Sequence, residues 1–176
     1  MAQTNWAIDP THSEIGFKVK HMMFTNVSGK FNTYEATITN EESAFETSKI
    51  NFNATIGSID TNNTDRDNHL KSADFFDAEN FPTLNFTATS IQKVNANQFQ
   101  IMGDLTIKDV TKSITLDAEY SGILKDPWGN TKVALAVSGA INRKEFGLTW
   151  NAALETGGVL VGEEIKLVAE IQLLQL

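Results

Sequence analysis

The sequence predicts an all-β protein, folded as an antiparallel up-and-down β-barrel. Apolar and polar residues alternate with period two along almost the whole chain, which is typical of strands with one buried and one solvated face. Short turn signals, such as Asp126-Pro127-Trp128-Gly129-Asn130, separate these runs and favour antiparallel neighbours. A set of about eight such strands buries its apolar faces by closing into a barrel, since a Greek key needs longer connections.

The first half of the chain contains four alternating runs. Between Phe31 and the run that starts at Tyr34 the alternation slips by one residue, and a β-bulge is the simplest explanation. The expected inward rows are Ile15, Phe17 and Val19; Tyr34, Ala36 and Ile38; Ile50, Phe52, Ala54 and Ile56; and Leu84, Phe86 and Ala88.

The second half contains four more runs of the same kind. Turn signals at Asn95-Ala96-Asn97 and Lys108-Asp109-Val110 separate the earlier ones. The expected inward rows are Phe99, Ile101, Leu105 and Ile107; Ile114, Leu116, Ala118 and Tyr120; Val133, Leu135, Val137 and Ile141; and Ile165, Leu167, Ala169, Ile171 and Leu173.

One polar segment, from Asp60 to Pro82, breaks the alternation. Either Asn63 or Thr64 is a suitable N-cap for one or two helical turns. We therefore expect a single barrel domain over residues 1–176 with a short helical insertion around residues 64–78.

Composition excludes several classes of function. The chain has 176 residues with 14 Lys+Arg against 22 Asp+Glu, and its net charge of −8 argues against nucleic-acid binding and against an electrostatic grip on anionic lipid. The absence of cysteine excludes disulfides, thiolate catalysis and cysteine-ligated metals.

The first ten residues have neither the basic start nor the apolar run of a signal peptide, and no later stretch approaches a membrane span. These features predict a cytoplasmic protein without stable membrane insertion. A mature exported protein behind an added Met1 would look similar, which leaves a periplasmic location open.

The inward rows mix phenylalanine with small residues such as Ala54, Ala88, Gly103 and Gly139, and a barrel of about eight strands has room for one small ligand. We therefore expect a hollow interior with an apolar lining. The expected lining residues are Phe17, Val19, His21, Phe31, Phe52, Ile56, Phe86, Ile101, Leu105, Leu135 and Trp150. His21 ends an inward row, where it is either a hydrogen-bonded core residue or a contact for a ligand head group.

Arg66 and Arg143 are the chain's only arginines, and both lie between expected strands. A guanidinium group binds a diphosphate bidentately, but each arginine has a nearby carboxylate, Asp67 or Glu145, as an alternative partner. The expected mouth or head-group residues are Phe24, Arg66, Phe75, Phe76, Arg143 and Phe146. So few arginines favour a neutral long-chain ligand.

Two other clusters contain residue types used in catalysis or metal binding. Asp9, His12 and Ser13 are the residue types of a hydrolytic triad, but neighbours 12 and 13 would point to opposite faces of a strand, so we expect turn capping by Asp9 and Ser13. The spacing of Asp65, Asp67 and His69 fits a metal in an extended segment. We favour helix capping and pairing with Arg66, and expect neither a metal nor a catalytic residue.

Several spaced blocks resemble the YceI-like family of bacterial lipocalin-like proteins, over essentially the whole chain. They are Trp6-x-Ile8-Asp9-Pro10-x-His12-Ser13-x-Ile15-x-Phe17-x-Val19-x-His21-Met22, Val27-x-Gly29-x-Phe31, Asp65-Arg66-Asp67-x-His69-Leu70-x-Ser72-x-Asp74-Phe75-Phe76-Asp77, Phe81-Pro82, Gly103-x-Leu105-Thr106-Ile107 and Arg143-x-x-Phe146-Gly147. The resemblance implies a lipocalin-like barrel that holds a long apolar molecule: a polyisoprenoid such as an isoprenyl diphosphate or isoprenoid quinone, or a fatty-acid derivative. It also implies a homodimer. Without a signal peptide, the sequence resembles the non-exported members.

We therefore expect a non-catalytic protein, without a cofactor, that carries or sequesters a long-chain apolar small molecule. One alternative is an enzyme that acts on a lipid or isoprenoid in the same cavity, with His21 or the 65–69 cluster as acid or base. Another is a dimeric, stress-related interaction module, which would use the outward row Ala134, Ala136, Ser138 and Ala140.

Overall fold

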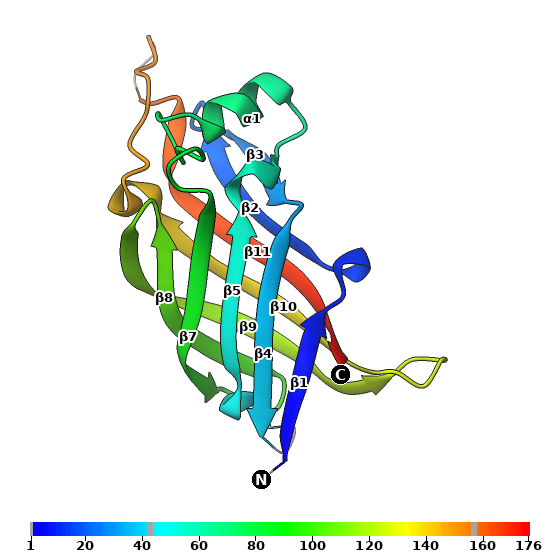
Figure 1. The fold of residues 1–176 in the computed structure, drawn as a ribbon. Helices are drawn as coiled ribbons and strands as arrows, with labels where there is room; N and C mark the ends of the chain where they lie inside the picture. The colour runs from blue at the N-terminus through cyan, green and yellow to red at the C-terminus, as the bar shows by residue number, and fades with distance from the viewer. Residues whose placement is uncertain (1, 42–43, 156–157) are drawn as a thin grey trace.

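A computed structural model describes residues 2–41, 44–155 and 158–176 (Figure 1). The strands are β1 (Gln3–Ile8), β2 (Glu14–His21), β3 (Thr25–Phe31), β4 (Tyr34–Glu41), β5 (Lys49–Thr55), β6 (Ile59–Asp60), β7 (Thr83–Lys93), β8 (Gln98–Ile107), β9 (Val110–Lys125), β10 (Thr131–Asn142) and β11 (Val161–Gln175). The α-helix is α1 (Thr64–Lys71), and four 3-10 turns are η1 (Pro10–His12), η2 (Phe45–Thr47), η3 (Ile56–Ser58) and η4 (Arg143–Phe146).

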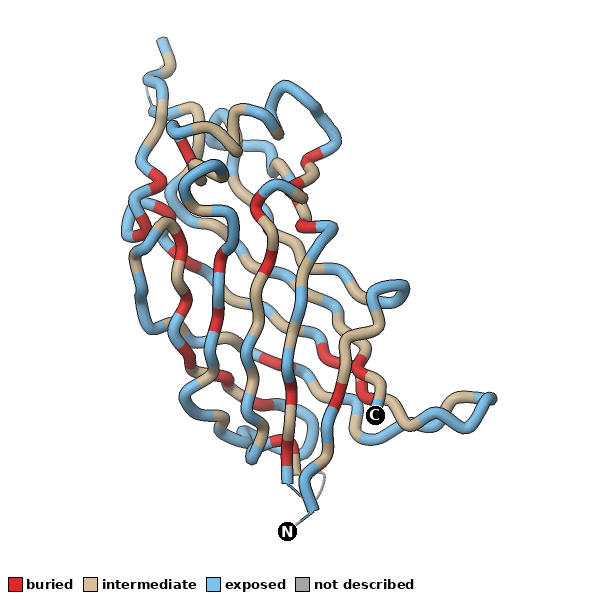
Figure 2. Tube along the Cα trace, in the orientation of Figure 1, coloured by how far each residue is buried: buried red, intermediate tan, exposed pale blue. Residues whose placement is uncertain are grey.

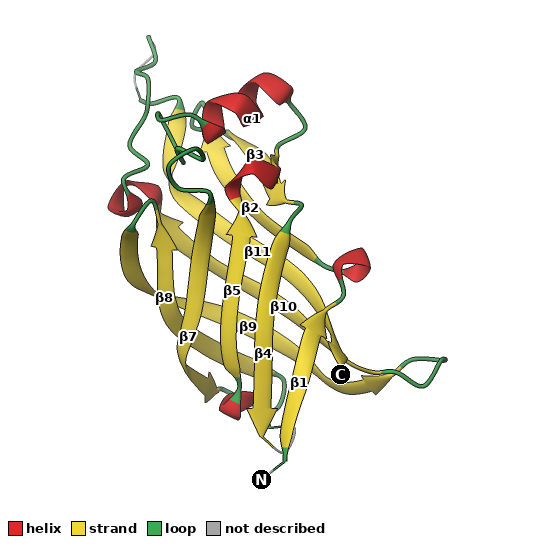
Figure 3. Cartoon of the chain, in the orientation of Figure 1, coloured by secondary structure: helices red, strands yellow, loops and turns green. Residues whose placement is uncertain are grey.

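The strands form a closed antiparallel barrel (Figure 3), which confirms the predicted fold class. The ring runs β1-β4-β5-β7-β8-β9-β10-β11 and closes by pairing of β11 with β1. The remaining short strands extend this ring: β2 continues β1 along β11, β3 precedes β4, and β6 follows β5. The barrel is thus an eight-stranded meander in the described part of the chain.

The slip in the alternation marks a bend rather than the β-bulge that we expected. β3 ends at Phe31 and β4 begins at Tyr34, and the 3-10 turns η1 and η3 interrupt the neighbouring strands beside this break. The backbone N–H of Asn32 donates to the carbonyl of Ser58 in η3, and the Tyr34 hydroxyl donates to the carbonyl of Ser13 after η1. Three adjacent strands therefore bend together. True register shifts occur elsewhere, for example between Ala88 and Ser90.

The predicted insertion is helical only in its first half. Asn63 is the N-cap, and its side chain accepts a hydrogen bond from the Arg66 N–H at 3.0 Å. The helix ends at Lys71, because the hydroxyl of the next residue, Ser72, donates to the His69 carbonyl and its backbone is extended. Turns follow over residues 73–80, where helix had been expected up to residue 78.

Both termini lie toward the same end of the barrel (Figure 1), and aromatic packing closes this end. The ring of Phe45, on η2, lies 4.9 Å from the ring of Phe99 and 5.0 Å from that of Tyr120. Beside this cluster the indole N–H of Trp6 donates to the side chain of Asn40, and both residues are buried (Figure 2). α1 covers the opposite end of the barrel. Among the residues that the structure describes, no helix is long and apolar enough to cross a membrane.

Candidate functional site: an apolar cavity in the barrel

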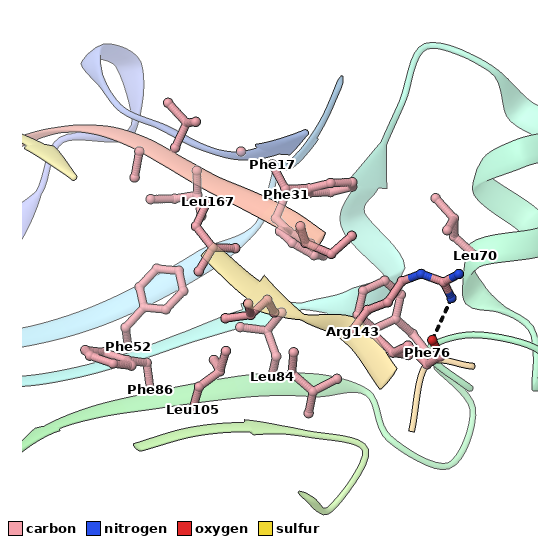
Figure 4. A pocket seen from close by; sticks show the side chains of 18 of the residues that line it. Phe17, Phe31, Phe52, Leu70, Phe76, Leu84, Phe86, Leu105, Arg143 and Leu167 are labelled. Atoms are coloured by element: carbon pink, nitrogen blue, oxygen red, sulfur yellow. Dashed lines mark hydrogen bonds between the residues drawn. The ribbon is translucent and has the colours of Figure 1, made fainter. Parts of the chain in front are cut away.

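The barrel contains a cavity of about 530 Å³ between the aromatic cluster and α1 (Figure 4). Its wall is almost entirely apolar, and every long strand contributes. The side chains that line it include Phe17, Phe31, Ala36, Ile38, Phe52, Leu84, Phe86, Ile101, Leu105, Ile114, Leu116, Leu135, Val137, Ile165, Leu167, Ala169 and Ile171. The volume lies within the range of about 300–1,000 Å³ that is usual for small-molecule sites.

The cavity ends at the same level on most strands. Next along each inward row, toward the termini, comes a buried residue that does not line the cavity. These residues are Asn40 on β4, Phe99 on β8, Ala118 on β9, Val133 on β10 and Leu173 on β11. They form a packed floor, so the cavity is closed at this end.

Glycines on the neighbouring strand make room for two aromatic rings inside the barrel. A Cβ on Gly103 would lie 2.5 Å from the Phe86 ring, and a Cβ on Gly29 would collide with the ring of Phe17, its cross-strand partner. Each ring therefore lies flat over the neighbouring strand instead of extending across the barrel. The glycines thus leave space for the rings against the wall, which is how small inward residues keep the interior of the barrel hollow.

Helix α1 and the turns after it form the other end of the cavity. The His69 ring contacts the rings of Trp150 and Phe75 at centroid distances of 4.7 and 5.0 Å, and a hydrogen bond of 2.9 Å joins His69 Nε2 to Asp74 Oδ2. The exposed residues Asp65 and Arg66 also line the cavity, so it reaches the surface here. We call this the mouth end; it comprises α1, the β2–β3 turn and residues 147–155 and 158–160.

Arg143 is a buried charged residue at the mouth end, with a relative exposure of 2%. Its guanidinium donates to four main-chain carbonyls, those of Leu148 (2.6 Å), Gly162 (2.7 Å), Trp150 (2.9 Å) and Val161 (3.3 Å). Burial lowers the pKa of this guanidinium. Its partners are therefore carbonyls and not Glu145, because the turn at η4 aims the side chain at the segment before β11.

Arg66 is bound to both the side chain and the main chain of Thr61. Its Nε donates to the Thr61 hydroxyl at 2.8 Å, and its Nη2 donates to the Thr61 carbonyl at 2.6 Å. Asp67 accepts hydrogen bonds from the N–H and hydroxyl of the same threonine, at 2.8 and 2.5 Å. The three side chains fasten the start of α1 to the end of β6. The expected ion pair between Arg66 and Asp67 is replaced by this shared contact.

Comparison with known proteins places this architecture in a family. The YceI-like domain matches residues 6–173. The chain belongs to the YceI-like family. It is 37% identical over 170 residues to a UPF0312 protein of Staphylococcus aureus (strain USA300), with 96% of each chain covered.

Two solved structures resemble the YceI-like barrel described here. A YCEI protein of Campylobacter jejuni is 33% identical, with 87% of each chain covered and a TM-score of 0.74. A polyisoprenoid-binding domain of Saccharophagus degradans, implicated in plant cell wall breakdown, has a TM-score of 0.66 at 10% identity, and the match covers 96% of this chain and 97% of that one. The second likeness is one of fold.

Most of the residues predicted to line the cavity or its mouth lie in the cavity wall of this YceI-like protein, and four do not. Val19 packs between its cross-strand neighbours Val27 and Ile165, Ile56 begins η3 in the packed core, and Phe146 is fully buried on η4 outside the cavity. Phe24 points into solvent with 83% of its surface exposed. The predicted residues that line the cavity are Phe17, His21, Phe31, Phe52, Arg66, Phe75, Phe76, Phe86, Ile101, Leu105, Leu135, Arg143 and Trp150.

The wall also includes the following five residues, which were not among those predicted to line the cavity: Leu70, Leu84, Leu116, Val137 and Leu167. Four of them belong to the inward rows, so the alternation alone contained the signal. Leu70 lies on α1, whose sequence has no apolar face pattern, and only the position of the helix over the barrel brings it to the wall.

His21 lines the cavity, and no hydrogen bond to its side chain occurs within the described ranges. Both interpretations of this residue, the hydrogen-bonded core histidine and the contact for a ligand head group, stay predictions. Its imidazole lies in the cavity wall near the mouth end.

The two clusters with catalytic residue types have structural roles. Asp9 accepts hydrogen bonds from the N–H and hydroxyl of Thr11, which confirms the expected turn capping by this residue. Turn capping by Ser13 was wrong, because its Oγ accepts a hydrogen bond from the Gln172 N–H on β11. The Thr11 hydroxyl and His12 hold the pKa of Asp9 well below its usual range. In the described part of the chain, no group of three His, Cys, Asp or Glu side chains is placed to hold a metal ion.

Proposed function

We propose that this protein binds one long-chain apolar molecule in the barrel and carries or sequesters it without changing it chemically. The observation that carries the proposal is an apolar cavity of about 530 Å³ with a packed floor at one end and surface access at the other. Apolar burial supplies the affinity in such a site, and a few polar groups at the mouth set the orientation of the ligand. The ligand's polar end therefore lies beside His21, Arg66 and Arg143.

The buried arginine supports a neutral ligand over a diphosphate. Arg143 uses four of its five N–H donors on carbonyls, and Arg66 uses two of its five on Thr61. A bidentate grip on a diphosphate needs two free donors on one guanidinium, which Arg143 lacks and Arg66 offers only from an exposed position on α1. An isoprenoid quinone or a neutral fatty-acid derivative requires only single hydrogen-bond donors, which His21 and the remaining N–H of Arg143 provide.

The chemistry of the wall also favours binding over catalysis. Acid–base catalysis requires two titratable groups that converge on the substrate. The titratable residues of the wall are His21, Asp65, Arg66, His69 and Arg143, and among the described residues no hydrogen bond joins any two of them. The partner of His69 is Asp74, which lies outside the wall.

The comparisons support a ligand of this class. The solved domain from Saccharophagus degradans, which shares the fold, is a polyisoprenoid-binding domain. A polyisoprenoid chain or the tail of an isoprenoid quinone fits an elongated apolar cavity as well as an acyl chain does, because such a wall discriminates by volume and little else.

Extraction of the purified protein with organic solvent, followed by mass spectrometry, tests the proposal. We expect a long-chain apolar compound close to one per chain. Ala169→Phe places a phenyl ring in the cavity, whereas Ala96→Phe adds the same ring to an exposed position on the turn between β7 and β8. The first variant loses the compound and the second keeps it. An empty extract from the wild-type protein, or equal loading of the two variants, contradicts the proposal.

Two further properties belong to the same proposal, a cytoplasmic location and a homodimer. The outward residues Ala136, Ser138 and Ala140 are exposed on β10, and small side chains permit close approach of a second copy. Ala136→Trp would disrupt such an interface. Gel filtration that finds a dimer unchanged by this substitution removes the surface from consideration.

A further inference from the structure

The turn between β2 and β3 exposes three consecutive large apolar side chains. Met22, Met23 and Phe24 are exposed by 55%, 62% and 83%. Met22 and Met23 have positive φ angles of 51° and 65°, a region in which turns usually place asparagine or glycine. A polar or glycine turn would be easier to form and more soluble here. The three apolar residues Met22, Met23 and Phe24, which we call the tip, therefore call for an explanation.

The tip adjoins the cavity directly. His21, the residue before it, lines the cavity, as does Leu160, whose carbonyl accepts a hydrogen bond of 2.8 Å from the Met22 N–H. Met23 lies over Gly158, where a Cβ would collide with its sulfur. The next residue, Val159, is itself 38% exposed. The apolar surface therefore continues from the wall of the cavity out to the tip, at the mouth end of the barrel (Figure 1).

Lysines flank the tip on the outer face of the barrel. Lys18 and Lys20 point outward from β2, and Lys166 on β11 is the direct cross-strand neighbour of Lys18. Two like charges side by side are unfavourable in a sheet. No salt bridge joins any of the three to a carboxylate in the ranges that the structure describes, whereas nearby Glu163 is bound to Lys144 at 2.8 Å. Lys20 Nζ donates to the Phe24 carbonyl, next to the tip.

Most acidic residues of the mouth end lie on the other side. Asp65 and Asp67 are on α1, and Asp74, Asp77 and Glu79 follow it. The lysines beside the β2–β3 turn outnumber the carboxylates there, where Glu164 on β11 is the exposed acidic neighbour of Lys166. The net charge of −8 hides this local arrangement.

We propose that the β2–β3 turn docks the protein on a lipid bilayer, with Met22, Met23 and Phe24 inserted among the acyl chains. Lys18, Lys20 and Lys166 then contact the phosphates of the head groups, and α1 faces away. Exposed apolar side chains beside a basic face are the arrangement of proteins that lie on a membrane surface without crossing it. The tip is convex, which suits a fluid apolar phase better than a shaped protein partner.

The docking proposal goes beyond ligand binding. It rests on the proposed function only for the reason why the protein would bind a membrane. A long-chain apolar ligand has very low solubility in water and resides in membranes, so docking with the mouth end toward the bilayer would let the ligand pass between bilayer and cavity without crossing water. The docking proposal is supported by the tip and the lysines, which do not depend on any ligand, and no ligand is present in the experiments below. Failure of one proposal is therefore distinguishable from failure of the other.

Vesicle sedimentation with the ligand-free full chain is the first test. We expect the wild-type protein to sediment with vesicles of phosphatidylcholine and phosphatidylglycerol. Phe24→Ser should weaken this partitioning about tenfold, because one inserted side chain of this size is worth about that factor. Trp128→Ser is the matched control, since Trp128 is also 83% exposed but lies on the β9–β10 turn away from the mouth end. Its partitioning should equal that of the wild type.

A fluorescent label provides a second readout that does not depend on affinity. The chain contains no cysteine, so Phe24→Cys and Trp128→Cys each offer a single labelling site. A polarity-sensitive dye at position 24 should shift to the blue when vesicles are added, and the same dye at position 128 should not. Equal shifts at the two positions, or none at either, overturn the proposed orientation.

The lysines are tested by their dependence on lipid charge. Exchanging Lys18, Lys20 and Lys166 for Gln should reduce partitioning to phosphatidylglycerol vesicles by about tenfold or more, and should have little effect with phosphatidylcholine alone. The same exchange at the exposed residues Lys49, Lys93 and Lys125 changes the net charge equally and is the control. Equal losses in the two triple variants would show a response to net charge only and contradict the assigned surface.

Discussion

The Arg143 guanidinium donates a hydrogen bond of 2.9 Å to the main-chain carbonyl of Trp150, and the indole of that residue forms part of the cavity wall. The same guanidinium binds three other carbonyls, so one side chain fixes the path of the chain between η4 and β11. The position of the wall at the mouth end thus depends on a residue that uses most of its donors on main-chain carbonyls.

Replacing this side chain should destabilise the protein strongly. In Arg143→Met, four carbonyls lose their donor in a buried site, and we expect the free energy of unfolding to fall by about 3–5 kcal/mol. Urea denaturation followed by tryptophan fluorescence measures the change. Lys144→Met, which removes only the exposed salt bridge to Glu163, should cost less than about 1 kcal/mol. Similar losses for the two variants would show that the carbonyl contacts of Arg143 contribute little.

The glycine covered by the Phe86 ring, Gly103, should tolerate no side chain. A Cβ at Gly103 would lie 2.5 Å from both the Phe86 ring and the Thr87 carbonyl, so Gly103→Ala should destabilise the barrel by about 1–3 kcal/mol. Gly57→Ala is the control, because nothing lies within 4 Å of a Cβ there. Thermal unfolding compares the two, and a Gly103→Ala variant as stable as the wild type would mean that the rings repack freely.

Asp9 should make the free energy of unfolding depend on pH in the acidic range. Its pKa in the folded state is held far below the unfolded value of about 3.9, so the ionised carboxylate favours folding. This contribution is complete above about pH 5 and is lost as the pH falls below the unfolded pKa toward the folded one. The difference in unfolding free energy between wild type and Asp9→Asn should therefore shrink from pH 7 to pH 3. A constant difference would contradict the prediction.

Trp150 should report on occupancy of the cavity. In the variant with Trp6→Phe and Trp128→Phe, Trp150 is the only tryptophan left. We expect its emission to change in intensity or wavelength when a long-chain apolar ligand is added to delipidated protein, because it lines the cavity. Ala169→Phe in the same background should abolish the response. A response that survives this blocking substitution would place the ligand elsewhere.

The period-two pattern was sufficient to predict the barrel because each strand has one wet and one dry face. Phe17, Phe52 and Phe86 were found in this way, and each lines the cavity. The pattern could not show where the cavity stops, since Phe99 and Ile101 occupy the same row and only one of them lies in the wall. That boundary depends on Phe45 and Tyr120, which come from distant parts of the chain.

The loops were predicted less well for a related reason. The partners of Arg143 are carbonyls, which every residue has, so composition gave no sign of them. Phe24 and Phe75 looked equivalent as mouth residues, yet one is exposed on a turn and the other is buried beside His69. Both outcomes depend on how the mouth-end segments pack together, which no local pattern encodes.

The closing seam of the barrel also sets an order for its assembly. One edge of β11 pairs with β10 and the other with both β1 and β2, so the C-terminal strand joins the last part of the chain to the first. Until this strand has left the ribosome, β1, β2 and β10 have unpaired edges, and the apolar interior is open to water. Such edges and surfaces are where misassembly and aggregation begin. The nascent chain is therefore most vulnerable while β11 is still to be synthesised.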